Sequence, residues 1–208
     1  MKKNIFFGNG IYADFLYNIE IEYMVDNKAE LQGSFYKGKI IKNPEELKKE
    51  NKENLFIYIT STATSDISKQ LQQMGFIEGV NFDDALKFID VESVRNIFSI
   101  GNEIEEEFIE IFVKCQPYTM TTWERLYSIY QSVNYIVKNN IKGDFAECGV
   151  WRGGSAMCMA YTLQKLNVKD RFIYLYDTYT GMSKPTENDK DVTGNLAEIT
   201  WGDLKRGT

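Results

Sequence analysis

The feature that most constrains the fold of this chain is a glycine-rich loop between two short apolar runs. The run 145–148 leads into the loop 149–154, which holds three glycines, and apolar residues at helical spacing begin near Ser155. A second apolar run, residues 172–176, ends in Asp177. The order of strand, glycine loop, helix, strand and acid predicts a parallel α/β unit. Its loop and its acid should meet at the carboxyl ends of the two strands.

The first ninety residues show the same alternation of strand and helix patterns. Apolar runs at residues 5–7, 21–25 and 55–60, with a shorter patch at 40–41, predict buried strands. Helical patterns are expected from Ile11 to Leu16, from Asn43 as an N-cap before Pro44, and from about residue 66 to Met74. We therefore expect an α/β protein, with an N-terminal Rossmann-like domain over residues 1–95 and a second unit over residues 96–208.

A short glycine motif follows the first expected strand. The stretch 8–13 fits a dinucleotide fingerprint with Ala13 in the third position, and Asp26 ends the second strand, where an acid can hold ribose hydroxyls. The alternative is a scaffold that needs the glycines for a tight turn and binds nothing. This segment resembles the small Rossmann-like domains attached to sugar-modifying enzymes of bacterial surface polysaccharides, and that resemblance implies no ligand by itself.

Composition excludes several kinds of chemistry. Histidine is absent, so His-dependent triads and His-ligated zinc are impossible. The net charge of -6 argues against nucleic-acid binding, and no apolar run is long enough to span a membrane. The three cysteines lack metal or disulfide spacing and are expected to be buried thiols, and no signal peptide is expected at the N-terminus. Together these features favour a cytoplasmic protein.

Two helices are expected between the units. Five glutamates between Glu103 and Glu110 alternate with apolar residues, which predicts an amphipathic helix with a solvated acidic face rather than a metal site. A second helix should open at 119–123 and present apolar residues from Trp123 to Val137 at steps of three and four.

The second glycine loop suits an adenosyl cofactor, S-adenosylmethionine. Glycines remove side chains where a cofactor must touch the backbone, and Asp177 can accept hydrogen bonds from ribose hydroxyls. Glu147 suits the ammonium of the methionine part, directly or through water. Arg152 or a hydroxyl in the segment 119–121 suits its carboxylate, and Trp151 either packs on the loop or contacts adenine.

Three segments, residues 119–126, 145–156 and 174–182, together resemble the macrocin O-methyltransferase family of the TylF/MycF type. The resemblance implies methyl transfer from S-adenosylmethionine to a sugar hydroxyl, with magnesium, and makes residues 96–208 a partial methyltransferase domain. The acceptor would be a small-molecule sugar or glycoconjugate. The expected cofactor-binding residues are Thr119, Met120, Glu147, Gly149, Val150, Trp151, Arg152, Gly153, Asp177, Thr178 and Gly181.

The second unit departs from a complete domain of that family, because it offers only two strands. After Met182 the chain turns polar, and Asp189 and Asp191 are expected in a solvated loop. The resemblance places the metal-binding acids and the catalytic base further along than this chain extends. We therefore name no catalytic residue and no metal ligand, and we expect a truncated form, incomplete or inactive, with open apolar surface that favours self-association. The rival hypothesis is a non-catalytic Rossmann-like module that binds a nucleotide or a partner protein.

Overall fold

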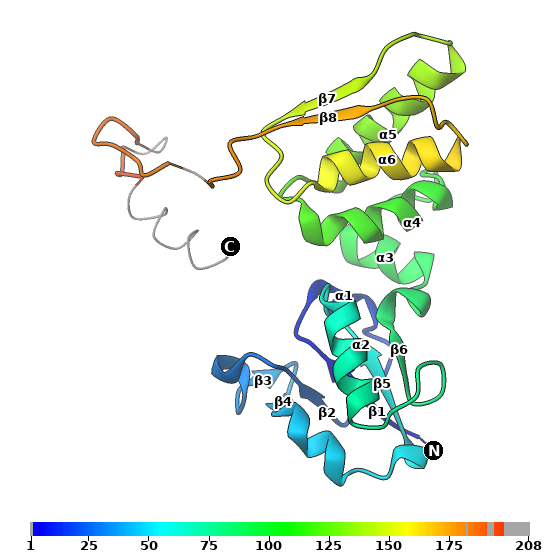
Figure 1. Ribbon diagram of the computed structural model, residues 1–208, viewed down its shortest axis with the longest axis vertical. Helices are drawn as coiled ribbons and strands as arrows, with labels where there is room; N and C mark the ends of the chain where they lie inside the picture. Colours follow the sequence, from blue (N-terminus) through cyan, green and yellow to red (C-terminus); the bar gives the residue numbers. More distant parts are fainter. Residues whose placement is uncertain (1, 182, 191–193, 198–208) are drawn as a thin grey trace.

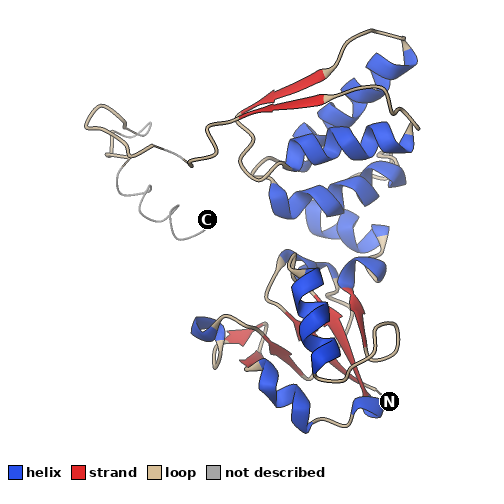
Figure 2. Cartoon of the chain, in the orientation of Figure 1, coloured by secondary structure: helices blue, strands red, loops and turns tan. Residues whose placement is uncertain are grey.

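The computed structural model describes residues 2–181, 183–190 and 194–197 (Figure 1). An α/β body occupies the N-terminal part, and a helical body that carries a separate pair of strands follows it (Figure 2). In chain order the elements are β1 (Lys3–Phe7), α1 (Ile11–Phe15), β2 (Tyr23–Val25), β3 (Phe35–Tyr36), β4 (Lys39–Lys42), β5 (Leu55–Ile59), α2 (Thr64–Gln73), β6 (Phe82–Asp84), α3 (Val91–Phe98), α4 (Glu106–Cys115), α5 (Trp123–Lys138), β7 (Phe145–Cys148), α6 (Gly154–Lys165) and β8 (Ile173–Tyr176). Short 3-10 helices lie at Ala29–Leu31, Pro44–Lys49, Lys52–Asn54, Ala85–Lys87 and Gln116–Tyr118.

In the N-terminal sheet, the other strands lie on both sides of the first strand, β1. The strand order is β3-β4-β2-β1-β5-β6, and all neighbours are parallel except β3 and β4. Side chains alternate along β1, so Phe6 joins the hydrophobic cluster on one face while Ile5 and Phe7 join the cluster on the other. Both faces of the central strand are therefore covered, as the apolar runs predict for a Rossmann-like sheet.

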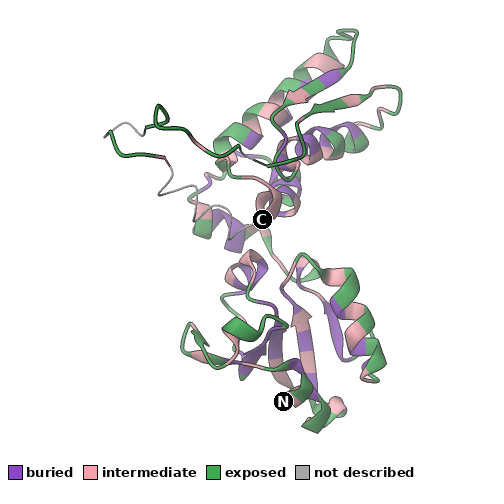
Figure 3. Ribbon diagram, turned by 60° about the vertical axis from the view of Figure 1, so that its left-hand side comes forward, coloured by how far each residue is buried: buried purple, intermediate pink, exposed green. Residues whose placement is uncertain are grey.

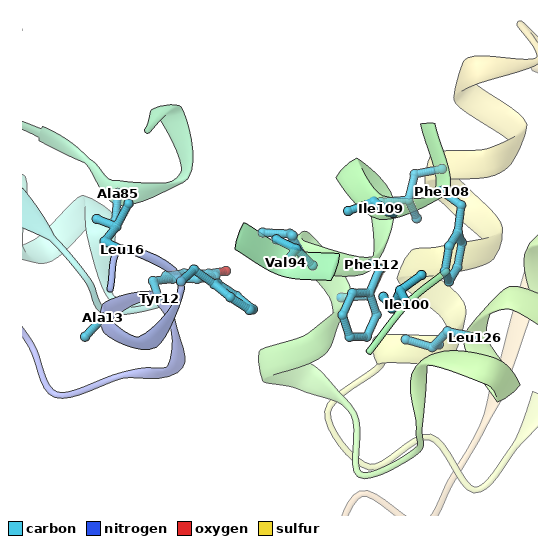
Figure 4. Packing of buried hydrophobic residues seen from close by; sticks show 14 of the residues in the cluster. Tyr12, Ala13, Leu16, Ala85, Val94, Ile100, Phe108, Ile109, Phe112 and Leu126 are labelled. Carbon is cyan, nitrogen blue, oxygen red and sulfur yellow. The ribbon is translucent and has the colours of Figure 1, made fainter. Parts of the chain in front are cut away.

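The helical body continues the core of the sheet rather than standing apart from it. One cluster of buried residues runs from Tyr12 in α1, past Val94 in α3, to Phe108 and Phe112 in α4 and Leu126 in α5 (Figure 4). Helix α4 lies against α3, α5 and α6. Its buried side is apolar and its glutamates are exposed, which confirms the predicted amphipathic helix, although the helix begins at Glu106 and ends at Cys115.

Strands β7 and β8 form a two-stranded parallel sheet with one covered face. Phe145 pairs with Ile173, and both contact a cluster built from α5 and α6. On the opposite face, Tyr174 and Tyr176 are 48% and 60% exposed. Buried residues concentrate in the larger sheet and between the helices, whereas these two strands carry mostly intermediate and exposed residues (Figure 3). An open apolar face is the expected result of a sheet that has only two strands.

Several local expectations need correction. Asn43 caps its segment through a hydrogen bond from the Glu45 N–H, as predicted, but residues 44–49 form a 3-10 helix. Cys148 is exposed, so the prediction of three buried thiols is wrong for it, because even positions of β7 face the uncovered side of the sheet. The strand β6 and the helix α3 were not expected at all. No helix in the described part of the chain is long and apolar enough to cross a membrane.

Candidate cofactor-binding site

The loop between β7 and α6 turns through three left-handed residues. Gly149, Trp151 and Gly153 have φ values of 81°, 49° and 86°. Glycine adopts such angles at little cost, which explains positions 149 and 153, whereas Trp151 adopts them despite its side chain. Gly153 is the N-cap of α6, so the loop delivers the backbone directly into the helix.

Asp177 lies against this loop at the end of β8. Its Oδ2 accepts hydrogen bonds from the Val150 N–H at 2.7 Å and the Trp151 N–H at 3.2 Å, and its Oδ1 accepts one from the Tyr179 N–H at 3.0 Å. The N–H donors of Tyr179, Val150 and Trp151 stabilise the charged carboxylate and hold the pKa of Asp177 below its ordinary value. The structure thus brings the predicted acid and the predicted loop together.

The start of α6 packs tightly on the segment before α5. A Cβ added at Gly154 would lie 2.5 Å from the Thr119 Cβ and 2.7 Å from the Tyr118 carbonyl oxygen. Only glycine therefore lets the loop reach Thr119, one of the predicted cofactor-binding residues. Gly154 was not among the predicted site residues, although the third glycine of the loop was the available signal.

Glu147 is the strongest sign that the site holds a further group. Its Oε2 is buried and has no hydrogen-bond partner in the part of the chain that the structure describes. A buried carboxylate oxygen without a partner is costly, so a cationic donor is its natural complement. The ammonium of S-adenosylmethionine is such a donor, and this residue therefore fits the expected cofactor.

The remaining predicted residues are placed at the surface around the loop. The Arg152 guanidinium lies 5.9 Å from the centre of the Tyr118 ring and 5.5 Å from that of Trp151. Met120, Trp151, Thr178 and Gly181 are all exposed, while Val150 is buried beneath the loop. Among the described residues, no hydrogen bond or ion pair assigns Met120 or Gly181 a role, whereas the Thr178 N–H helps to stabilise the Asp177 carboxylate.

Metal ligands are not gathered in the described residues. No group of three or more acidic or cysteine side chains there could hold a metal ion. Asp189 is exposed in a turn, where it accepts hydrogen bonds from the N–H and hydroxyl of Thr186, and Asp191 lies outside the described residues. Because these residues do not fit a magnesium site, no step is assigned to that ion.

A hollow of about 460 Å³ lies at the carboxyl ends of β1, β2 and β5. Asp26 lines it and accepts hydrogen bonds from the N–H groups of Asn9 and Lys28. A Cβ at Gly8 would lie 2.7 Å from the Ser61 Cβ, and one at Gly10 would lie 2.5 Å from the Thr60 carbonyl oxygen. Close packing against the end of β5 therefore explains the glycines of the first motif, and they carry no evidence for a bound phosphate.

The glycine loop, the aspartate that closes on it and the parallel pairing of β7 and β8 form a strand–loop–helix–strand unit of the Rossmann type. The family profile of Macrocin-O-methyltransferase (TylF) matches residues 113–201 of this chain. A methyltransferase of this family implies the use of S-adenosylmethionine.

Relatives match over the same part of the chain. Demethyldecarbamoylnovobiocin O-methyltransferase of Streptomyces niveus is 38% identical over 65 residues, which is 31% of this chain and 25% of the relative. Mycinamicin III 3''-O-methyltransferase of Micromonospora griseorubida is 32% identical over 79 residues, 38% of this chain and 31% of the relative. The solved structure of the O-methyltransferase NovP is 36% identical, with a TM-score of 0.32, over 35% of this chain and 30% of that chain. The matched part thus spans about a quarter to a third of the relatives' length.

Proposed function

We propose that this chain is an S-adenosylmethionine-dependent O-methyltransferase of the macrocin type that acts on a sugar hydroxyl. Residues 96–208 would supply the cofactor-binding part, and residues 1–95 would form an N-terminal Rossmann-like domain. The observation that carries the proposal is Asp177, whose carboxylate accepts the N–H groups of Val150 and Trp151 in the loop.

The cofactor would lie over this loop, outside the carboxyl ends of β7 and β8. Asp177 uses three backbone donors, and its remaining lone pairs suit ribose hydroxyls. Glu147 would take the ammonium, and Thr119 or Arg152 the carboxylate. Gly149 and Gly153 would let the cofactor approach the backbone.

S-adenosylmethionine supplies the electrophilic methyl group, and the acceptor hydroxyl must be aligned with it and lose a proton. The residues above bind and orient the donor. We assign no catalytic base within the described residues, and magnesium remains part of the proposal by family resemblance alone.

The names of the relatives support a small-molecule acceptor for this chain. They describe methylation of novobiocin, mycinamicin and tetracenomycin compounds, the last at a rhamnosyl group. We therefore propose a sugar or glycoconjugate acceptor rather than a nucleic acid. We also propose that the open face of β7 and β8 favours association between copies of the chain.

Titration of the full chain with S-adenosylmethionine by isothermal calorimetry tests the function. Asp177→Asn should weaken binding about tenfold or more, because charged hydrogen bonds contribute roughly 1.5–3 kcal/mol each. Asp170→Asn, an exposed aspartate close to the start of β8, is the matched control and should bind as the unaltered chain does. Circular dichroism establishes that both variants fold. Equal affinity in the two variants, or no binding by the unaltered chain, would overturn the proposal.

A second candidate function is nucleotide binding by the N-terminal domain. The hollow at the carboxyl ends of β1, β2 and β5 favours it. Two of the residues that line this hollow, Thr119 and Arg152, come from the proposed methyltransferase part. Nucleotide binding and methyl transfer are therefore compatible functions of one chain.

A further inference from the structure

The hollow beside Asp26 occupies the position where open α/β sheets bind ligands. The chain leaves β1 toward β2 on one side and returns to β5 on the other, so the winding direction changes at β1. The loops after β1, β2 and β5 all line the hollow, and its volume of about 460 Å³ is within the usual range for small-molecule sites.

Asp26 is a suitable acceptor for ribose hydroxyls. The residue is only 8% exposed, and each carboxylate oxygen accepts one backbone N–H, from Asn9 at 2.9 Å and from Lys28 at 2.8 Å. Those two bonds fix the orientation of the carboxylate and leave further lone pairs. The acid at the end of the second strand is thus preorganised and still able to accept hydrogen bonds.

The glycine motif cannot supply the anion-binding part of such a site. Gly8 and Gly10 are required by their contacts with Ser61 and Thr60, and α1 has only five residues. The positive charges in the lining are instead Lys28 and Arg152.

Arg152 reaches the hollow from the second half of the chain. Its guanidinium lies over the Tyr118 ring, and no carboxylate of the described residues lies within 4.0 Å of it in an ion pair. A planar guanidinium held against aromatic rings is well suited to bind phosphate through two parallel hydrogen bonds.

Gln116 adds a polar group without a partner. Its Oε1 is buried and accepts no hydrogen bond from the described residues, and Gln116 lines the same hollow. A base with an N–H or amino donor would satisfy this oxygen.

We propose that this hollow binds a ribonucleoside diphosphate, with ribose on Asp26, phosphates on Arg152 and Lys28, and the base near Gln116. Because Arg152 belongs to the glycine loop of the methyltransferase part, the bound nucleotide would lie between the two halves of the chain. The nucleotide would then be the carrier of the acceptor sugar. This carrier role rests on the methyl-transfer function proposed above, whereas the binding does not.

Calorimetric titration of the full chain with ADP, GDP, UDP and NAD tests the site. At least one diphosphate should bind, its 2'-deoxy form should bind more weakly, and added salt should lower the affinity. NAD should bind less well, because the glycines that precede the five-residue helix α1 pack against Ser61 and Thr60 and leave no room for its pyrophosphate there. Arg152→Ala should weaken binding about 10- to 100-fold, as expected for loss of charge-assisted hydrogen bonds. Arg125→Ala, at an exposed arginine of α5, is the control and should change nothing.

The two sites can be separated by their variants. Asp26→Asn should weaken nucleotide binding and keep S-adenosylmethionine binding, while Asp177→Asn should weaken S-adenosylmethionine binding and keep nucleotide binding. If Asp26→Asn fails to fold, the surface variant Arg152→Ala and the 2'-deoxy ligand still decide the question. The inference is overturned if none of the diphosphates binds, or if Arg152→Ala binds like Arg125→Ala. Binding of S-adenosylmethionine alone would overturn this site and leave the methyl-transfer proposal in place.

Discussion

Replacement of Gly154 by alanine sets two effects of opposite sign against each other. Alanine in place of glycine favours a helix by about 0.5–1 kcal/mol in a helix interior, and less at the first residue of α6. The new Cβ, however, would lie 2.5 Å from the Thr119 Cβ and 2.7 Å from the Tyr118 carbonyl oxygen. Neither neighbour is the end of a flexible side chain, so backbone must move, and overpacking of this kind costs about 1–3 kcal/mol. We therefore expect a net loss of about 1–2 kcal/mol in the free energy of unfolding.

The expected loss corresponds to a fall in Tm of several degrees, at about 2–4 °C per kcal/mol for a chain of this size. Thermal and urea unfolding measure it, and calorimetry with S-adenosylmethionine shows whether the displaced loop also binds less well. Ser155→Ala, one residue further along α6, is the control because it adds no atom to this contact. A Gly154→Ala chain that is as stable as the unaltered one, with unchanged affinity, would refute the close contact between α6 and Thr119.

Four further outcomes are expected. Phe108→Ala should lower the free energy of unfolding by about 3–5 kcal/mol in urea titration, because the ring is fully buried between α4 and α5; a loss below 1 kcal/mol would contradict this packing. Asp90→Ala removes the N-cap of α3 and should lower the free energy of unfolding by about 0.5–2 kcal/mol. Asp90→Asn should lower it much less, because asparagine also caps helices. Because the pKa of Asp177 is lowered, its bonds to the loop should persist above the ordinary pKa near 3.8 and break as the pH falls through the lower folded value. The amide NMR signal of Val150 reports this change, and a signal that titrates near neutral pH would exclude the assignment. Tyr176→Lys should reduce self-association in analytical ultracentrifugation if the open strand face mediates it, and unchanged association would place the interface elsewhere.

Patterns local in the sequence were sufficient for much of the fold. Apolar runs identified β1 and β5, since a buried strand must be apolar whatever lies around it. They also identified β7 and β8, although most residues of these two strands are not buried. Elements with a weaker pattern were missed. The strand β6 reads Phe82-Asp83-Asp84, with two acids, and it is a strand because it pairs with β5. Tertiary context overrides local propensity at such a position.

The candidate cofactor site was also predictable in outline from the sequence. A glycine loop between a strand and a helix, followed by a strand that ends in an acid, must bring that acid near the loop when the strands are parallel. The contacts of Asp177 with Val150 and Trp151 agree with that expectation. The contact of Gly154 with Thr119 joins residues 35 positions apart, and no local pattern encodes it.

The sequence alone therefore determined the strands that have clear apolar runs, the loops that are rich in glycine and the acids that follow β2 and β8, because these properties depend on neighbours in the chain. Only the tertiary structure showed which neighbouring residues require glycine at these positions. Those at 8 and 10 accommodate the end of β5, and the one at 154 accommodates Thr119. It also placed Arg152 beside the hollow of the N-terminal sheet. Such contacts depend on the packing of distant segments, and packing is a property of the whole fold.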